Sequence, residues 1–266
     1  MSITISFPLF VPADRPDRLA RAANSSADAV LADLEDAVAH DRKSAAREAL
    51  SVWLSGSPTQ STVCIRINAE GDAAHAADLE LCRRQGIAAI MLPKAEAAGA
   101  VARVKARTGL PVIALIETAR GLAQVEEIAT EAAQLAFGSI DFAADLEMQH
   151  TALALYHARS RIVLASRLAG IAAPLDGVTT AVRDEDQLRR DCTHAVELGF
   201  GGKLLIHPDQ IAPARAAFAP DPSTVDWALR VLAAEGAGAV LVDGEMVDPP
   251  VLARARQVLR RAGRAG

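Results

Sequence analysis

The sequence predicts an α/β fold, a (β/α)8 TIM barrel that is followed by a short C-terminal arm made of helices and a hairpin. Short apolar segments alternate with longer Ala-, Arg- and Glu-rich segments of helical spacing, which is typical of parallel strands joined by right-handed crossovers. There are eight apolar segments, about 25–30 residues apart, and this number favours a closed barrel. An open dinucleotide-binding sheet would carry a Gly-x-Gly-x-x-Gly motif after its first strand, and none follows here.

The clearest strand covers residues 112–117, which are apolar on both faces and end in Glu117. Such a strand belongs to a parallel sheet that helices cover on both sides. In chain order, the expected strands are residues 8–12, 29–35, 62–68, 89–94, 112–117, 134–141, 175–180 and 203–207. The expected helices between them are residues 15–25, 42–54, 73–85, 96–108, 121–132, 151–169 and 184–198.

The pattern changes after His207-Pro208, where three further prolines interrupt the chain. A helix is expected over residues 225–235, then a hairpin with an Asp-Gly turn over residues 236–248, and a last helix from Pro249 to about Arg261. We therefore predict a barrel of residues 1–212 and an arm of residues 213–266. The arm is too short for an independent domain, so it is expected to pack on the barrel or on a neighbouring subunit.

Composition excludes several classes of function. The 266 residues are 51% hydrophobic and 23% charged, an ordinary globular balance, while a net charge of −5 and 3% aromatic residues argue against a nucleic-acid partner. No apolar run reaches the roughly 18 residues of a membrane span, and the N-terminus lacks the basic start of a signal peptide. Cys64, Cys82 and Cys192 form no CxxC pair, which indicates reduced thiols. A cytoplasmic protein without a membrane partner is expected.

Polar residues stand where the expected strands end, and in a barrel these ends meet at the catalytic face. Glu117 and Asp141 each close an apolar run, and two carboxylates whose remaining positions go to water and substrate are the usual way to hold Mg²⁺. Each acid is equally compatible with a helix cap or an arginine pair. Asp33, Glu35 and Asp36 are expected around this site, where Glu35 and Asp36 would position metal-bound water or, for Asp36, cap a helix.

The basic residues have alternatives of their own. Arg66 could bind a carboxylate or a developing oxyanion through its planar fork, or form a salt bridge with Asp33 or Glu35. Lys94 could form a Schiff base, although nearby acids would keep its ammonium charged. Arg15 and Arg18 could meet phosphates or remain solvated, and His207 could serve as a base or as a structural histidine.

Several motifs follow one another along almost the whole chain. They run from Leu-Phe-Val-Pro at residues 9–12 and Ala-Asp-Leu-Glu-Asp-Ala-Val at 32–38 through Ile-Arg-Ile-Asn at 65–68 and Leu-Pro-Lys at 92–94. The set continues with Ala-Leu-Ile-Glu-Thr-Ala-Arg-Gly at residues 114–121, Phe-Gly at 137–138, Asp-Gly-Val at 176–178, Gly-Gly-Lys-Leu-Leu-Ile-His-Pro at 201–208 and Asp-Gly-Glu-Met-Val-Asp at 243–248. In this order, the set resembles the citrate lyase β-subunit-like enzymes of the metal-dependent HpcH/HpaI aldolase superfamily and is specific for that family.

The resemblance implies a homo-oligomeric barrel, usually a homotrimer, that binds Mg²⁺ or Mn²⁺ and acts on 3-hydroxyacyl thioesters of coenzyme A or an acyl carrier protein. It implies metal binding by Glu117 and Asp141 and substrate binding by Arg66. It also implies that Asp248 enters the active site of an adjacent subunit and acts there as an acid or base. The residues alone would make Asp248 a turn residue.

Three positions depart from the family pattern. Ala13-Asp14 replaces the usual Gly and Asn or Ser, which places an acid beside the expected thioester entrance. Ile140 replaces a Glu before the expected metal-binding Asp141, and Glu147 replaces a Gly, so the loop at Glu147 is expected to differ.

The function expected is a Mg²⁺-dependent carbon–carbon lyase that acts on a citryl-, citramalyl- or malyl-type thioester and releases a keto acid and an acyl-CoA. A direct aldolase acting on a free hydroxy-keto acid, an acyl-CoA thioesterase, and an assembly subunit of a larger lyase complex are the alternatives.

Overall fold

The structure is a computed structural model that describes residues 3–56, 61–83, 86–235 and 241–263. The chain divides into two compact units, Met1–Ala214 and Arg215–Gly266. Parts of two expected segments lie outside the described residues: residues 84–85 of the helix expected over 73–85, and residues 236–240 of the hairpin expected over 236–248.

The first unit is a barrel of parallel strands, as predicted. Its eight-stranded sheet follows chain order from β1 to β8, and every neighbouring pair is parallel. The ring closes where Leu9 pairs with Leu205 and the Phe10 backbone N–H donates to the Leu205 carbonyl at 2.8 Å. The strands are β1 (Pro8–Pro12), β2 (Ala29–Asp33), β3 (Thr62–Arg66), β4 (Ala89–Leu92), β5 (Val112–Ile116), β6 (Gln134–Phe137), β7 (Ala172–Asp176) and β8 (Gly202–Lys203).

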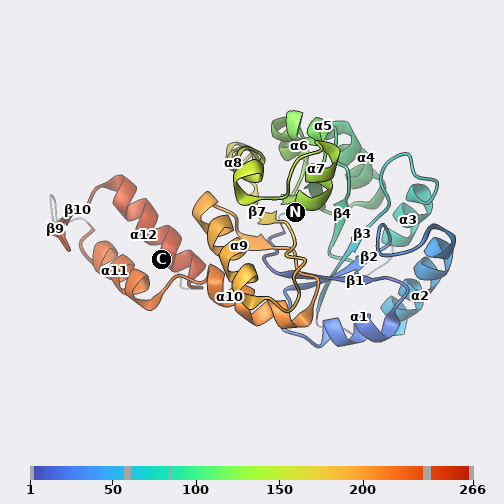
Figure 1. The fold of residues 1–266 in the computed structure, drawn as a ribbon, viewed down its shortest axis with the longest axis horizontal. Coiled ribbons are helices and arrows are strands. Elements are labelled where there is room, and N and C mark those ends of the chain that lie inside the picture. Colours follow the sequence, from blue (N-terminus) through green and yellow to red (C-terminus); the bar gives the residue numbers. More distant parts are fainter. Residues whose placement is uncertain (1–2, 57–60, 84–85, 236–240, 264–266) are drawn as a thin grey trace. The chain divides into compact units, whose positions relative to one another are not determined.

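Helices surround the strands of this unit (Figure 1). They pack their apolar faces on the outward residues of the strands; α8, for example, buries Leu155, Ala158, Ile162 and Ala165. The helices are α1 (Pro16–Ala23), α2 (Lys43–Gly56), α3 (His75–Cys82), α4 (Ala98–Thr108), α5 (Ala119–Ala123), α6 (Val125–Glu131), α7 (Ser139–Asp145), α8 (Ala152–Leu168), α9 (Glu185–Leu198) and α10 (Ile211–Phe218), with 3-10 turns η1 (His40–Arg42) and η2 (Pro208–Gln210).

Strand alternation decides which side chains enter the barrel. Leu31, Cys64, Met91, Ile113 and Leu115 belong to one buried cluster, and each lies two positions from the next inward residue of its strand. Continuing this alternation by two residues reaches Asp33 on β2, Arg66 on β3 and Glu117 after β5. Apolar side chains therefore fill the middle of the barrel, and Asp33, Arg66 and Glu117 lie where their strands end.

Three expected elements are corrected. The sixth strand was expected to run to Asp141, but β6 ends at Phe137 and Asp141 lies in α7. Ser139 and Ile140 continue the strand-like sequence that precedes them, but both already belong to α7. The seventh strand begins at Ala172 rather than at residue 175. The helix expected over residues 121–132 is two helices, α5 and α6, which meet at Gln124.

The second unit contains α11 (Pro222–Ala233), the antiparallel pair β9 (Leu241–Val242) and β10 (Glu245–Met246), and α12 (Pro249–Arg261). The predicted Asp-Gly turn joins the two strands, and Asp243 and Gly244 have φ of 52° and 87°. Two positive φ values in succession suit the right-handed twist of a hairpin. The two helices bury an apolar cluster of their own, which includes Val225, Val231 and Leu259.

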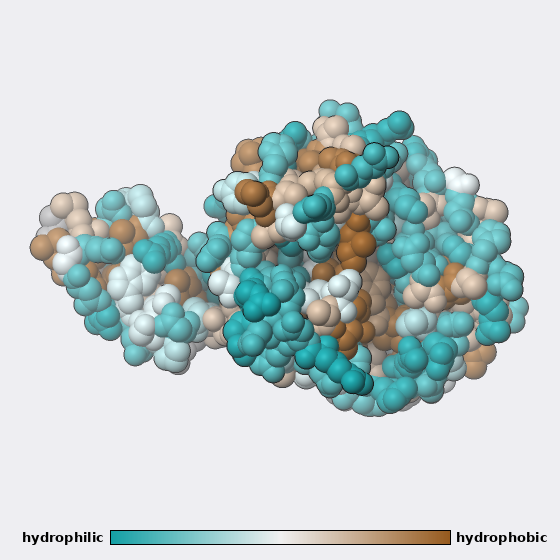
Figure 2. All heavy atoms as spheres, in the orientation of Figure 1, coloured by the Kyte–Doolittle hydropathy of each residue, from teal (hydrophilic) through white to brown (hydrophobic). Residues whose placement is uncertain are grey.

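The described residues include no helix that is both long and apolar enough to cross a bilayer. On the face of the barrel unit seen in Figure 2, hydrophilic side chains surround a hollow with hydrophobic side chains inside it. This hollow is the expected position of a site in a barrel.

Candidate active site

The polar residues at the ends of β2 and β3 form a buried ion-pair cluster. Asp33 and Arg66 are direct partners in the register of the two strands. Arg66 donates from Nε to Asp33 Oδ1 at 2.8 Å and from Nη2 to Asp33 Oδ2 at 2.6 Å. Its guanidinium also lies over the Phe10 ring, 4.8 Å from the centroid. A bidentate pair of this kind fixes the orientation of the guanidinium.

The remaining edge of this guanidinium faces two more acids. Arg66 Nη1 lies 3.0 Å from Glu35 Oε2 and 3.4 Å from Asp36 Oδ2. Burial raises the pKa of Glu35 to about 7 against the opposing effect of Arg66, and the neighbouring Asp36 raises it further. The salt bridge that the sequence left as one interpretation of Arg66 is thus present, and the arginine is rigid where it meets the cavity.

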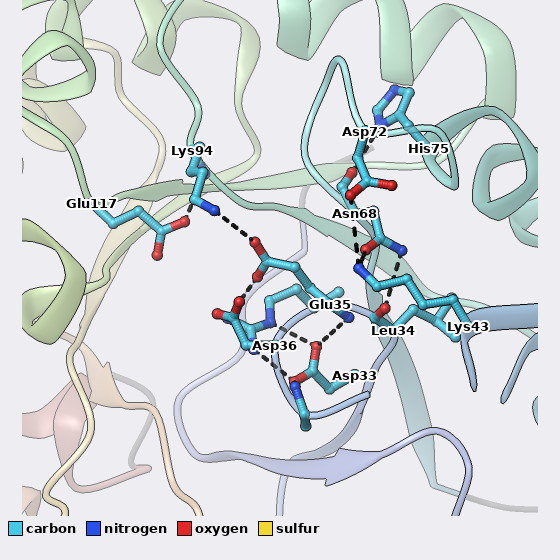
Figure 3. Close-up of polar contacts among 12 residues, drawn as sticks. Asp33, Leu34, Glu35, Asp36, Lys43, Asn68, Asp72, His75, Lys94 and Glu117 are labelled. Carbon is cyan, nitrogen blue, oxygen red and sulfur yellow. Dashed lines mark hydrogen bonds and ion pairs between the residues drawn. The ribbon is translucent and has the colours of Figure 1, made fainter. Parts of the chain in front are cut away.

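Lys94 connects this cluster to Glu117. Its ammonium lies 3.4 Å from Glu35 Oε1, and its backbone N–H donates to Glu117 Oε1 at 2.7 Å (Figure 3). The backbone has a φ of 46°, a conformation that costs a side-chain-bearing residue about 1 kcal/mol and directs this N–H to the carboxylate. Burial would lower the pKa of Lys94, but Glu35 and the other acids raise it. The ammonium therefore stays charged, which disfavours the Schiff-base interpretation.

Glu117 is buried with one carboxylate oxygen left over. Its side chain accepts the Lys94 N–H through Oε1, whereas Oε2 is buried without a hydrogen-bond partner among the described residues (Figure 3). Burial and the charge of Glu35 raise the pKa of Glu117 to about 8. An unpaired buried carboxylate is costly unless a cation or a proton compensates it.

Glu117 and Asp141 both line a cavity of ≈ 520 Å³. Asp141 is exposed on the first turn of α7, and it opposes ionisation of Glu117. No group of three or more His, Cys, Asp or Glu side chains gathers for a metal anywhere in the described parts of the chain. Two carboxylates with open positions nevertheless fit a hard divalent cation that keeps water and ligand oxygens. The cavity lies at the carboxyl ends of β1, β2, β3, β5 and β6, and the residues that line it include Phe10, Pro12, Arg18, Asp33, Arg66, Glu117, Gly138, Ser139 and Asp141.

The structure brings most of the residues singled out in the sequence to this cavity. Asp33, Asp36, Arg66, Glu117 and Asp141 line it, and Glu35 and Lys94 contact them directly. Asp36 pairs with Arg66 instead of capping a helix.

Three other residues singled out in the sequence have different hydrogen-bond or ion-pair partners. Arg15 is half exposed, and its Nε lies 3.7 Å from Asp17 Oδ1. His207 caps η2, where its Nδ1 accepts from the Asp209 N–H at 3.2 Å. Asp248 belongs to the second unit, where its carboxylate accepts from the Val251 N–H at 2.9 Å and caps α12.

The departures from the family pattern have visible effects on the backbone and the surface. Glu147 has a φ of 52°, a backbone conformation that favours glycine, although the residue carries a long side chain. Asp14 lies 3.8 Å from Arg42, which partly compensates its charge.

Sequence reasoning missed two features of the molecule. Gly138 lies directly against Glu117, because a Cβ at Gly138 would come 2.5 Å from the Glu117 Cβ and closer still to Oε2. The second is a buried cluster of Arg159, Asp176 and Lys203 on the outer side of the strands. The available signal for this cluster was Asp176, an acid inside the strand expected over residues 175–180.

Comparisons with known proteins agree with this architecture. The sequence model of the HpcH/HpaI aldolase/citrate lyase family matches residues 6–208. A citrate lyase subunit beta-like protein of Mycobacterium tuberculosis is 42% identical over 97% of this chain and 95% of its own length. A (3S)-malyl-CoA thioesterase of Cereibacter sphaeroides is 35% identical over 96% of this chain and 93% of its own length.

A crystal structure shows the same fold. The protein CitE of Mycobacterium tuberculosis, in complex with magnesium, acetoacetate and coenzyme A, is similar with a TM-score of 0.85 and 38% identity, covering 99% of this chain and all of the other. Together with the barrel and the strand-end acids, these matches show that the chain belongs to the HpcH/HpaI aldolase/citrate lyase family.

Proposed function

We propose that this chain is a magnesium-dependent carbon–carbon lyase that cleaves a citryl-, citramalyl- or malyl-type acyl thioester into an acyl-CoA and a keto acid. The observation that carries the proposal is the unpartnered buried Oε2 of Glu117, a residue that lines the same cavity as Asp141 and Arg66. A dicarboxylic substrate needs one cation for its carboxylate and hydroxyl oxygens and one fixed donor for its thioester end. Residues for both roles line the cavity, with Glu117 and Asp141 for the cation and Arg66 as the donor.

Glu117 and Asp141 would hold the magnesium ion. When bound, the ion would act as a Lewis acid on the oxygens of the keto-acid half. Glu117 must be ionised to bind the ion. Its raised pKa of about 8 applies to the carboxylate without a cation beside it, and the charge of a bound cation would favour the ionised form. The backbone N–H of Lys94 donates to Glu117 Oε1 and so fixes the orientation of the carboxylate.

Arg66 would stabilise the enolate oxygen that develops when the carbon–carbon bond breaks. Asp33 already holds Nε and Nη2, so the guanidinium cannot rotate, and a ligand would meet it at the Nη1 edge, beside Glu35 and Asp36. Donors that are fixed before the reaction need no reorganisation as charge develops. Glu35, between Arg66 and Lys94, keeps both cations oriented toward the cavity mouth.

The assay that tests the proposal is the release of pyruvate, glyoxylate or oxaloacetate from citramalyl-, malyl- or citryl-CoA, with and without magnesium. Metal-dependent release of a keto acid together with an acyl-CoA supports it. Turnover of a free hydroxy-keto acid, with none of the thioesters cleaved, would instead indicate a direct aldolase. Inactivity of the isolated chain, with activity only in the presence of co-purified subunits, would indicate an assembly role.

Hydrolysis of the thioester is the second candidate function. It is favoured by the 35% identity with a protein named as a (3S)-malyl-CoA thioesterase. The two reactions are distinguished by their products, because hydrolysis yields free coenzyme A and the intact hydroxy acid, whereas cleavage yields an acyl-CoA and a keto acid.

We further propose that the protein works as a homo-oligomer, in which the arm of one subunit delivers Asp248 to the cavity of a neighbour, where it protonates the enolate. The family resemblance supports this role. In the chain itself, Asp248 is half-buried and directly precedes two prolines that rigidly start α12.

Replacing Asp248 with asparagine is expected to lower kcat by about 10²–10⁴-fold, because asparagine cannot transfer the proton. Asparagine caps helices as well as aspartate does, so the free energy of unfolding should stay within about 0.5 kcal/mol. Steady-state kinetics and urea denaturation measure the two effects. Asp248→Ala provides the comparison, since it removes the cap as well; wild-type turnover in Asp248→Asn would exclude the acid–base role.

Replacing Gly138 with alanine is expected to lower kcat/KM by about 100-fold, because the added Cβ displaces the Glu117 carboxylate. Magnesium affinity, measured by calorimetry, should fall in parallel. Gly99→Ala is the matched control, since its Cβ in α4 would contact only the flexible Arg103 side chain at 3.2 Å. Equal kinetics of the two variants would contradict the assigned position of Glu117.

A further inference from the structure

A second cavity, of ≈ 460 Å³, lies between α8, α9 and the loop that follows β7. Its walls use one face of each helix: Thr151, Leu155 and Arg159 recur at intervals of four along α8, and Gln187, Arg190, Asp191 and His194 at intervals of three and four along α9. Of the residues that line it, Val178 also lines the first cavity. The second cavity therefore adjoins the candidate active site but is built from different charged residues.

Arg159, which lines this cavity, belongs to a buried cluster with an excess of positive charge. Arg159 Nε donates to Asp176 Oδ1 at 2.9 Å, and Lys203 Nζ donates to Asp176 Oδ2 at 3.1 Å. All three side chains are almost fully buried. Burial would raise the pKa of Asp176, but the two cations together lower it. One carboxylate thus faces two buried cations, and such an imbalance is costly unless a further anion compensates it.

The rim adds donors rather than acids. Arg190 is exposed on α9, and the His194 ring accepts from Arg159 Nη1 through Nδ1 at 3.4 Å, so its Nε2 carries the proton. Asp191 is the acid among the lining residues, and its oxygens already accept from Thr179 Oγ1 at 2.6 Å and Gln187 Nε2 at 2.7 Å. Counted over the Arg, Lys and Asp side chains, the three cations and two carboxylates of this region leave one net positive charge.

We propose that the cavity between α8 and α9 is a second binding site, which takes a small organic oxyanion through Arg159, Arg190 and His194. The guanidinium of Arg159 is held between Asp176 and the Phe137 ring, whose centroid lies 5.9 Å away, so it is preorganised for a ligand. The volume is that of a small-molecule pocket and exceeds that of a bare inorganic ion. A carboxylate and a phosphate ester share the required chemistry.

Calorimetry of the full-length chain with two probes, malonate and inorganic phosphate, distinguishes these two sources. Saturable binding of malonate identifies a carboxylate ligand, and saturable binding of phosphate identifies a phosphate ester. Arg190→Gln should weaken the binding of the active probe at least tenfold. The substitution is at an exposed helix position with a residue of good helix propensity, so folding is preserved.

Arg189→Gln is the matched control. It removes the same charge from the same helix, but Arg189 pairs with Glu185 and Asp186 and does not line this cavity. Its affinity for the probe should stay within twofold of wild type. A second control, Arg18→Gln, alters the first cavity. The proposal is overturned if neither probe saturates in the millimolar range, if Arg189→Gln and Arg190→Gln lose affinity equally, or if only Arg18→Gln loses it.

Discussion

Replacing Glu117 with glutamine is expected to abolish magnesium binding and to lower turnover by at least about 100-fold, a loss typical of damaged metal ligation. The variant keeps the size of the side chain and an oxygen that can still accept the Lys94 N–H, but it removes the charge that compensates the ion. Magnesium titration by calorimetry and steady-state kinetics measure both losses.

The same variant should change how stability depends on pH in the metal-free protein. The pKa of Glu117 is about 8 in the folded chain and 4.5 for an ordinary glutamate, so the folded state binds the extra proton between these values. Wild-type stability therefore falls as pH rises through this range, by up to about 1.4 kcal/mol per pH unit from this group. Glu117→Gln lacks this slope. Urea denaturation in the presence of a chelator should therefore show the stability of the variant rising relative to that of wild type as the pH increases.

Glu127→Gln is the matched control for both measurements, because Glu127 is exposed on α6. It should leave metal affinity, turnover and the pH slope unchanged. Magnesium affinity retained in Glu117→Gln would contradict the metal assignment, whatever its stability.

Replacing Asp176 with asparagine is expected to destabilise the barrel by about 3–5 kcal/mol. The variant leaves Arg159 and Lys203 buried without a counterion, and removing one partner from a buried pair typically costs this much. Denaturation by urea, followed by circular dichroism, should show the loss as a lower midpoint.

Two further variants isolate the cause of that loss. Asp186→Asn removes an exposed carboxylate on α9 that pairs with Arg189, and it should change stability by less than about 0.5 kcal/mol. The double variant Asp176→Asn with Lys203→Met removes one of the two stranded cations and should recover part of the stability. A loss below about 1 kcal/mol in Asp176→Asn would show that water or relaxation compensates the cations.

The barrel could be predicted from the sequence because burial on both faces leaves a continuous apolar run. The expected strands that begin at residues 8, 29, 62, 89, 112 and 134 start where the structure starts them. The first of them also ends where expected, at Pro12. The ends of the other five were placed too late, because residues such as Glu35, Asn68 and Lys94 continue the strand-like sequence after the backbone has left the sheet. At Asp141 the error was larger, because the strand-like composition continues through Ile140 although β6 ends at Phe137 and α7 begins at Ser139.

The site could be predicted only in part, because the sequence indicates which residues reach the barrel mouth but not which of them pair. Strand ends brought Asp33, Arg66 and Glu117 together as expected. That Asp33 binds Arg66 on two nitrogens, or that Lys94 contributes its backbone N–H rather than its ammonium to Glu117, depends on side-chain rotamers and one unusual φ. The Arg159–Asp176–Lys203 cluster joins a helix to two strands, and no spacing in the sequence reports such a contact.

The strands pair in chain order, so the ring is joined only where β1 meets the segment at Leu205. A nascent chain leaves the ribosome from its N-terminus, at about 5–20 residues per second, so β1 waits on the order of 10–40 s for its last neighbour. Throughout that interval its free edge can template pairing with other chains. Protection of the unfinished barrel during translation is therefore a requirement of this topology.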